Sequence, residues 1–451
     1  MSTNHGTEEK TTTAWRLLIN FLLYVSPVAL LTTVFPMVTP TINRYNLDGV
    51  PLIQVILAAS ITVPWLSQAA CLPLYRAIQM EHKKIADARE GLRIHAETLE
   101  HQLKRAEARA VRARMSEPQF QDITDLTAFT RNWLYLFFMT MPLVLLFAIP
   151  VALVLHWSPT AFGAFFVLGV LNIAFAQLLV IPNLAKNRII WFIAWLGYTL
   201  ALYCYPVIWF LPPLVGSLIL LVSLGKDLVH LLHFARITLK DIALDALRGF
   251  FTGSIIWADK YMLFLVTGGE INVVAIYLSL IPCVIAYNYF FVVEADRVNA
   301  SIQHLWTIFD RLPYKGVQEE SSKALRTSNH AIRNSLLIYI ASAIVTGILM
   351  FIFLPQSYPL ALSGLVVAFL FVAVALLIYQ IEYMTMYVTV QLLSAAHLVL
   401  LFISFMILPN ETGYLPIIVG ETVLAFACYR VYRQAWAAPE YSLFWRRALA
   451  W

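Results

Sequence analysis

The chain has 451 residues, of which 60% are hydrophobic and only 13% are charged. This composition leaves too little polar surface for a soluble protein of that length and favours an integral membrane protein. We attribute the net charge of +5 to membrane topology and anionic lipid rather than to nucleic-acid binding.

Apolar stretches of about 20 residues predict an all-α membrane protein with about twelve transmembrane helices. An even number places both termini on the same face of the membrane. The predicted helices are centred near Leu23, Ala59, Val144, Val170, Trp195, Leu218, Trp257, Leu280, Ala343, Ala368, Ala395 and Leu424.

Two polar inserts interrupt the spans at corresponding places, one after the second span and one after the eighth, which indicates two six-helix halves. The first span is too long for a signal peptide and lacks a small-residue cleavage site, so we expect an uncleaved anchor. In chain order we predict an N-terminal arm (1–14), two spans (15–75), a helical insert (76–130), four spans (131–225), an amphipathic interfacial linker (226–248), two spans (249–294), a second insert (295–333), four spans (334–432) and a tail (433–451).

Basic residues fall almost entirely on one side of this topology, because 29 of the 31 Lys and Arg residues lie on the face that carries the termini. The positive-inside rule makes that face cytoplasmic. We therefore expect a multi-pass protein of the cytoplasmic (inner) membrane with both termini inside. The opposite loops are short, which argues against a receptor with a large external domain.

The first insert has a seven-residue apolar repeat at Ile78, Ile85, Leu92 and Leu99, and no proline occurs between residues 75 and 117. These features predict one continuous helix projecting about 60 Å into the cytoplasm. Residues 76–115 could dock a partner or the second insert, self-associate as a coiled coil, or remain a solvated charged helix.

Catalytic and ligand-binding motifs are scarce. The sequence around Gly225 and Lys226 lacks the first Gly and the Ser or Thr of a phosphate-binding loop, which argues against ATP hydrolysis. Asp227, His230 and His233 share a helical face that metal ligands could use, although interfacial polar residues are the commoner case. We expect a protein that is not an enzyme and that has no metal and no cofactor.

Ionisable residues inside the spans are the main candidates for function, because each costs about 2.5–3.5 kcal/mol near the bilayer centre. Asp259 and Lys260 in the seventh span could face a substrate or ion cavity, or form a structural pair between helices; the cavity role is favoured. Trp257 and Tyr261 flank them and could stack on sugar rings or serve only in packing. The secondary candidates are His397, Glu421, Glu294 and Asp296, with a structural role favoured for the first two.

The seventh span, GSIIWADKYMLFL, resembles the Trp-x-Asp-Lys span of the Pel exopolysaccharide transporter family, part of the multidrug/oligosaccharidyl-lipid/polysaccharide (MOP) exporter superfamily. The stretch YFFVVEADRV, with Glu294 and Asp296, is similar to that family's aromatic and acidic exit from the eighth span. The resemblance implies a flippase or exporter that moves a polysaccharide or lipid-linked sugar by alternating access, with Asp259 and Lys260 on a central cavity.

Two other functions remain open from the sequence. The chain could be a non-transporting scaffold of an exopolysaccharide or envelope assembly complex, or an integral membrane enzyme acting on lipid-linked sugar. The expected partners are membrane lipid, the sugar substrate and, through residues 76–115, a cytoplasmic glycosyltransferase or an envelope-complex subunit.

Overall fold

The computed structural model describes residues 5–101, 104–114, 124–185, 187–232, 237–270, 272–309 and 311–449. The only strands in these ranges are β1 (Asn46–Leu47) and β2 (Val50–Pro51), which form an antiparallel hairpin. Asp48 and Gly49 form its turn with positive φ angles of 48° and 89°, the conformation that Asp-Gly turns adopt with little strain. All other elements are helical.

The first half of the molecule, up to residue 223, contains the helices that precede the central linker. They are α1 (His5–Ile42), α2 (Leu52–His101), α3 (Arg105–Arg114), α4 (Asp125–Thr140), η2 (Met141–Val144), α5 (Leu145–Val154), α6 (Pro159–Leu178), α7 (Val180–Leu184), α8 (Arg188–Cys204) and α9 (Leu211–Ser223).

The second half follows the linker element η3 (Gly225–Leu232). It comprises α10 (Leu239–Val266), α11 (Val273–Tyr289), the π-helical turn η4 (Phe290–Glu294), α12 (Ala295–Ile308), α13 (Tyr314–Phe353), η5 (Pro355–Ser357), α14 (Tyr358–Tyr383), α15 (Tyr387–Ile407), η6 (Asn410–Gly413), α16 (Tyr414–Ala435) and α17 (Pro439–Leu449).

Nine helical segments of the described chain are long and apolar enough to cross a membrane. α8 and α9 are shorter, with 17 and 13 residues, and α10 is less apolar because it contains Asp259 and Lys260. The twelve predicted spans therefore stay a prediction for these three helices. Large apolar side chains on the outside of the bundle, such as Leu153 and Val423, are 69% and 66% exposed, as lipid-facing residues are. The chain is an all-α integral membrane protein, as the sequence predicts.

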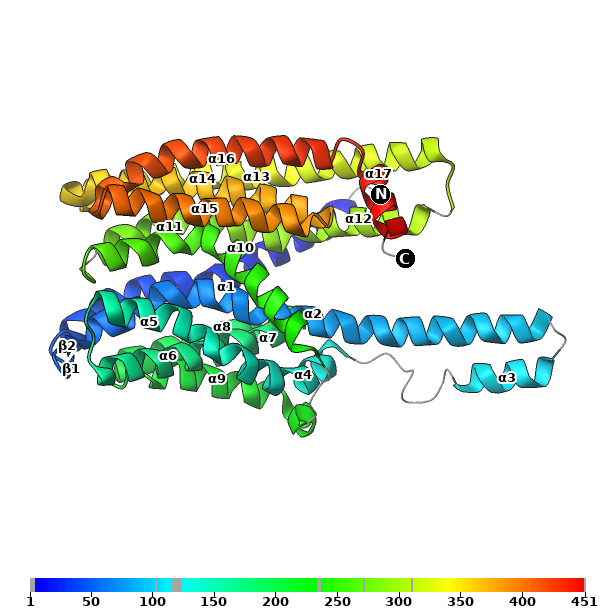
Figure 1. Cartoon of the computed structure of the whole chain (residues 1–451), viewed down its shortest axis with the longest axis horizontal. Coiled ribbons are helices and arrows are strands. Elements are labelled where there is room, and N and C mark those ends of the chain that lie inside the picture. The colour runs from blue at the N-terminus through cyan, green and yellow to red at the C-terminus, as the bar shows by residue number, and fades with distance from the viewer. Residues whose placement is uncertain are drawn as a thin grey trace.

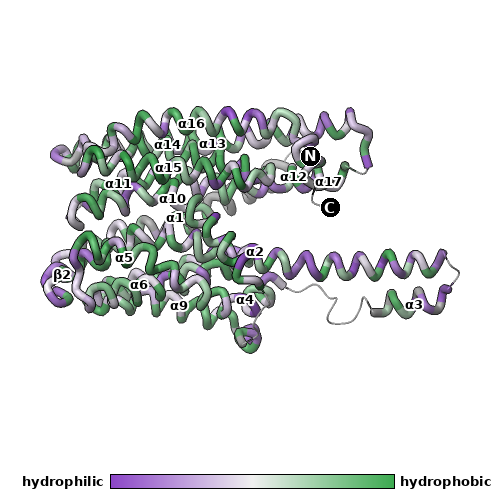
Figure 2. Tube along the Cα trace, in the orientation of Figure 1, coloured by the Kyte–Doolittle hydropathy of each residue, from purple (hydrophilic) through white to green (hydrophobic). Residues whose placement is uncertain are grey.

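The two halves form two layers, with α1 and α10 crossing obliquely between them (Figure 1). We call the end that carries the strand hairpin the loop end, and the end from which α2 projects the arm end. α10 starts beside α2 and finishes among α14 and α15, whereas α1 contacts both α8 and α11. Each half therefore contributes one helix to the boundary between them. Hydrophobic residues dominate this bundle, and hydrophilic ones dominate the projection (Figure 2).

Two glycines allow α10 to lie directly on α2. A Cβ atom added to Gly249 would lie 2.4 Å from the carbonyl oxygen of Gln68, and one added to Gly253 would lie 3.0 Å from Trp65. Trp65 Nε1 donates a hydrogen bond of 2.7 Å to the carbonyl oxygen of Phe250. Small residues four apart permit such close backbone approach in membrane helices.

Ion pairs reinforce this junction at the arm end. Arg76 of α2 contacts Asp245 of α10 at 2.5 Å, and Arg248 of α10 pairs with Glu382 of α14. The Arg248 guanidinium also lies 3.8 Å from the ring centroid of Tyr387 on α15. α10 is thus tied at one level to α2, α14 and α15.

The projecting arm differs from the predicted single helix. α2 leaves the bundle and ends at His101, and α3 turns back alongside it (Figure 1). Ala96 and Leu99, which a lone helix would expose to water, are 0% and 8% exposed. The prediction of one uninterrupted helix was wrong, because packing of α3 covers apolar side chains that a straight helix leaves in water. Met115 lies outside the described residues.

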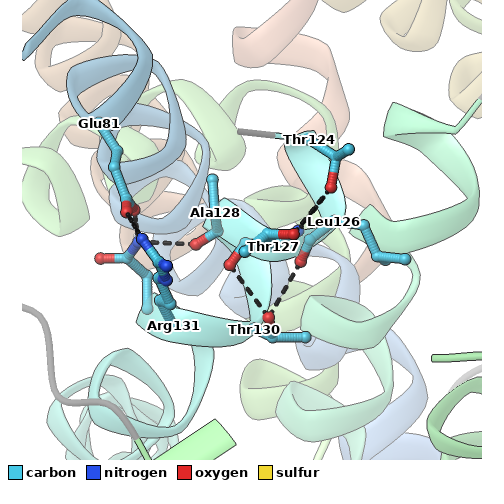
Figure 3. A network of polar contacts seen from close by, with 8 residues as sticks. Glu81, Thr124, Leu126, Thr127, Ala128, Thr130 and Arg131 are labelled. Atoms are coloured by element: carbon cyan, nitrogen blue, oxygen red, sulfur yellow. Dashed lines mark hydrogen bonds and ion pairs between the residues drawn. The ribbon is translucent and has the colours of Figure 1, made fainter. Parts of the chain in front are cut away.

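The arm is fixed to the bundle at its base. Glu81 accepts hydrogen bonds from Arg131 Nη1 at 3.2 Å and from Asn132 Nδ2 at 2.8 Å. Thr124 caps α4 by accepting a bond from the Thr127 amide (Figure 3). These contacts set the direction in which α2 leaves the bundle.

The linker between the halves also differs from the predicted interfacial helix over 226–248. η3 is bent by 103° from α9, and α10 begins at Leu239 behind the N-cap Thr238. The Thr238 hydroxyl accepts from the Asp241 amide at 3.2 Å, which favours a helix start at this point. The last ten residues of the predicted linker therefore belong to α10. His233 lies outside the described residues.

Candidate functional site

α10 carries Asp259 and Lys260 into the interior of the second half. The two residues are only 2% and 4% exposed, and Lys260 Nζ lies 2.8 Å from Asp259 Oδ1. α10 ends at Val266, so the pair lies about 10 Å along the helix from the loop end. Neighbouring helical residues point about 100° apart, and the long lysine side chain closes that angle.

Both charged groups have further partners. The Tyr414 hydroxyl, on the first residue of α16, donates to Asp259 Oδ2 at 3.1 Å. Lys260 Nζ donates to the carbonyl oxygen of Ile256 at 2.8 Å and lies 5.4 Å from the ring centroid of Phe371 on α14. Such contacts compensate part of the cost of burying two charges.

A second ionisable pair also contacts Phe371. The His397 ring packs edge-on against Phe371 with a centroid separation of 5.0 Å. Its Nδ1 lies 2.7 Å from Glu421 Oε1, and both residues are fully buried. The structure therefore joins His397 and Glu421 to the Asp259 and Lys260 pair through one aromatic ring.

This second pair has unused hydrogen-bonding capacity. His397 Nε2 and Glu421 Oε2 have no hydrogen-bond partner among the described residues. The contact between Nδ1 and Oε1 is satisfied either by a neutral pair or by an imidazolium and a carboxylate, because one proton can reside on either atom. Either arrangement keeps the contact between the two side chains.

The aromatic residues beside Asp259 face a different part of the molecule. The Tyr261 hydroxyl donates to the carbonyl oxygen of Phe147, on α5 of the first half, at 2.9 Å. Its ring also packs against Trp65 at 6.0 Å. Trp257 lies one helical turn earlier and is partly buried against the same apolar core. Tyr261 therefore joins the halves, and the structure does not place it around the charged pair.

Glu294 and Asp296 lie apart from this cluster, where α11 passes into α12 through η4. Glu294 is 3% exposed and accepts hydrogen bonds from Tyr289 at 2.9 Å and Asn334 at 3.0 Å. Asp296 is exposed. These contacts fix the second insert against α13, and π-helical turns of this kind often occur at functional sites.

The sequence reasoning missed Tyr414 and Phe371. Both are aromatic residues in apolar spans, and Tyr414 is separated from Asp259 by 155 positions along the chain. Nothing in the local sequence distinguishes them from core aromatics.

In the described residues, no group of three or more His, Cys, Asp or Glu side chains could hold a metal ion.

No protein-family model matches the chain, and no curated protein matches it. Several solved structures are similar to it. A multidrug resistance MATE family transporter of the MOP superfamily, in an outward-facing conformation, is 12% identical with a TM-score of 0.45, over 94% of this chain and 95% of that one. A MATE structure in complex with MaL6 is 11% identical with a TM-score of 0.47, over 93% and 96%. A likeness at this level assigns neither family nor substrate.

Proposed function

We propose that the protein is a transporter that moves a polysaccharide or lipid-linked sugar across the cytoplasmic membrane. The concentration of buried ionisable side chains in one half carries the proposal. Asp259, Lys260, His397 and Glu421 lie within membrane-spanning helices, where a charge costs several kcal/mol unless it is paired. The sugar substrate is proposed from the resemblance of residues 253–265 to the Pel family.

The arm end is proposed to face the cytoplasm, because it carries the basic inserts. In this conformation the charged pair is enclosed by α10, α14 and α16, which suits a response to protons or cations better than contact with a sugar polymer. α10 links such a response to the boundary between the halves, since Gly249 contacts α2 and Asp259 lies inside the second half. Rocking of the halves around this helix would alternate access.

The test is transfer of a fluorescent NBD-labelled polyprenyl-diphosphate sugar across the membrane of reconstituted vesicles. Added dithionite quenches only outer-leaflet probe, so transfer appears as additional quenching. Asp259→Asn keeps the shape of the side chain and an acceptor for Tyr414 but removes the charge. We expect it to lose transfer at least tenfold while inserting normally into the membrane.

Glu440→Gln is the matched control, because Glu440 is a 6% exposed carboxylate on α17, outside the spans. It should retain transfer. Normal transfer by Asp259→Asn would remove the pair from the mechanism. Cleavage of the probe in place of transfer would favour the membrane enzyme.

A scaffold role is the second candidate, and the arm favours it. α2 and α3 form a helical hairpin that projects from the apolar bundle (Figure 1), and we propose that it docks a cytoplasmic glycosyltransferase or an envelope-complex subunit. His82 Nε2 lies 2.8 Å from Asp125 Oδ1, so a short Gly-Ser linker can replace residues 84–122 without disturbing the bundle. A scaffold should lose all polymer secretion in cells with this variant, whereas a transporter should keep transfer in vesicles.

A further inference from the structure

A groove of about 390 Å³ opens on the outer surface of the second half. α14 supplies its floor with Phe369, Ala373 and Leu377, and α13 supplies one wall that includes Leu336 and Ile340. The opposite wall is formed by α16. The groove is separate from the ionisable cluster, none of whose members lines it.

Hydrogen bonds close the groove at the arm end. The Tyr432 hydroxyl on α16 contacts Ser328 Oγ at 2.9 Å and donates to Asn329 Oδ1 on α13 at 2.9 Å. Ser328 also donates to Gln380 of α14 at 2.9 Å. This network holds the three helices at fixed spacing, so the groove is built into the fold.

A cation lies at this closed end. Arg333 lines the groove and is exposed, and its Nη2 donates to Nδ1 of His330 at 2.9 Å. Because arginine can only donate, His330 accepts through Nδ1 in this contact. Among the residues that the structure describes, none of the ion pairs includes Arg333.

The groove's dimensions and surroundings match one lipid chain. Arg333 and Ile340 are seven residues apart, so the lined wall runs about 10 Å along α13, most of the roughly 15 Å depth of a single leaflet. Leu337 and Ile340 are 55% and 43% exposed on the membrane-facing surface. A groove with an apolar wall and a cationic end selects an amphiphile with an anionic headgroup.

We propose that this groove binds one anionic phospholipid of the leaflet at the arm end. Its acyl chain lies on Phe369, Ala373 and Leu377, and its phosphate contacts the Arg333 guanidinium. The Tyr429 side chain, which is 46% exposed at the wall, covers the upper part of the chain. The site is independent of what the protein transports.

The experiment compares purified full-length protein in neutral detergent, titrated with palmitoyl-oleoyl phosphatidylglycerol or with phosphatidylcholine of the same chains. Thermal unfolding reports binding, and native mass spectrometry counts the lipid retained. Phosphatidylglycerol should bind at least tenfold more tightly, because the choline cation of phosphatidylcholine offsets the phosphate charge that Arg333 attracts. Arg333→Gln should abolish this preference, and Arg311→Gln, which changes an exposed arginine of the same insert, should keep it.

One further variant and two further probes separate the contributions. Ala373→Phe fills the floor and should reduce binding of both lipids, while Arg333→Gln affects only the anionic one. A retained preference in Arg333→Gln, or equal binding of both lipids by the unaltered protein, overturns the proposal. Equal stabilisation by inorganic phosphate alone would overturn it in favour of a simple anion site. Displacement of phosphatidylglycerol by equimolar polyprenyl phosphate would assign the groove to a lipid carrier instead.

Discussion

The buried polar groups of the two halves differ in kind. In the described part of the first half they are all uncharged, whereas the second half contains buried acids, a lysine and a histidine. The first set is Thr62, Thr130, Asn132, Thr140, Asn172, Gln177, Thr199 and Ser217. The charged or titratable members of the second are Asp245, Asp259, Lys260, Glu294, His397 and Glu421, with Glu440 on α17 outside the spans.

This difference separates two uses of polarity inside a helical membrane bundle. Gln177 shows the first use, because its Nε2 donates to the carbonyl oxygen of Ala70 and to the hydroxyl of Thr140, at 2.9 and 3.0 Å. Neutral contacts of this kind hold helices together at low cost. Buried charges carry a large desolvation cost and do not stabilise helix packing more than neutral hydrogen bonds do. Their restriction to one half therefore points to a functional difference between the halves.

The largest effect should come from breaking the charged pair. Asp259→Ala leaves Lys260 buried without its carboxylate and should lower the free energy of unfolding by about 3–5 kcal/mol. Adding Lys260→Met should recover most of that loss, because the uncompensated charge disappears. Thermal unfolding of both single variants and the double variant in detergent gives the coupling energy. Additive losses would show that the two side chains do not act as a pair.

A smaller loss of stability should follow from forcing α10 away from α2, at the contact that joins the two halves. Gly249→Ala places a methyl group 2.4 Å from the carbonyl oxygen of Gln68. Neither backbone can shift without moving its whole helix. This overpacking should therefore lower the free energy of unfolding by about 1–3 kcal/mol. Gly163→Ala is the control, since nothing lies within 4 Å of its added Cβ. Equal unfolding temperatures for the two variants would contradict the close junction between α2 and α10.

The neutral hydrogen bonds of the first half should contribute less to the free energy of unfolding. Gln177→Leu removes two hydrogen bonds and should cost about 0.5–2 kcal/mol. Transfer of the labelled lipid-linked sugar should continue, because Gln177 has only an adhesive role. A complete loss of transfer with an unchanged unfolding temperature would instead give the first half a functional polar site.

The smallest effect is expected on the exposed arm. The hydrogen bond from Arg93 Nε to Glu90 is 2.8 Å long and lowers the pKa of Glu90. The stabilisation that this hydrogen bond gives the folded state is therefore present above the pKa that Glu90 has in the unfolded chain. It is lost as pH falls and the carboxylate becomes protonated. Arg93→Ala should leave the unfolding temperature unchanged within error, because solvent screens this pair. A pH-dependent loss larger than that of Gln177→Leu would mean that the arm is packed against another surface.

The candidate site residues could be selected from the sequence, but their arrangement could not, and the reason is physical. Asp259, Lys260, His397 and Glu421 were recognisable singly because each is an ionisable residue within an apolar stretch. Their proximity to one another around Phe371 could not be recognised from the sequence, since it depends on how four helices pack. Tyr261 shows the same limit, because a residue two positions from Asp259 contacts the opposite half.

The membrane class, the positions of the spans and the predicted side of the basic inserts follow from sequence alone. They depend on local hydropathy and charge, and a helix in lipid satisfies its backbone hydrogen bonds within itself. Tertiary structure decided the return of α3 along α2, the start of α10 inside the predicted linker, and the aromatic ring between the two ionisable pairs. Those features arise from contacts between segments far apart in the chain, where the energy depends on shape complementarity and burial that no local pattern records.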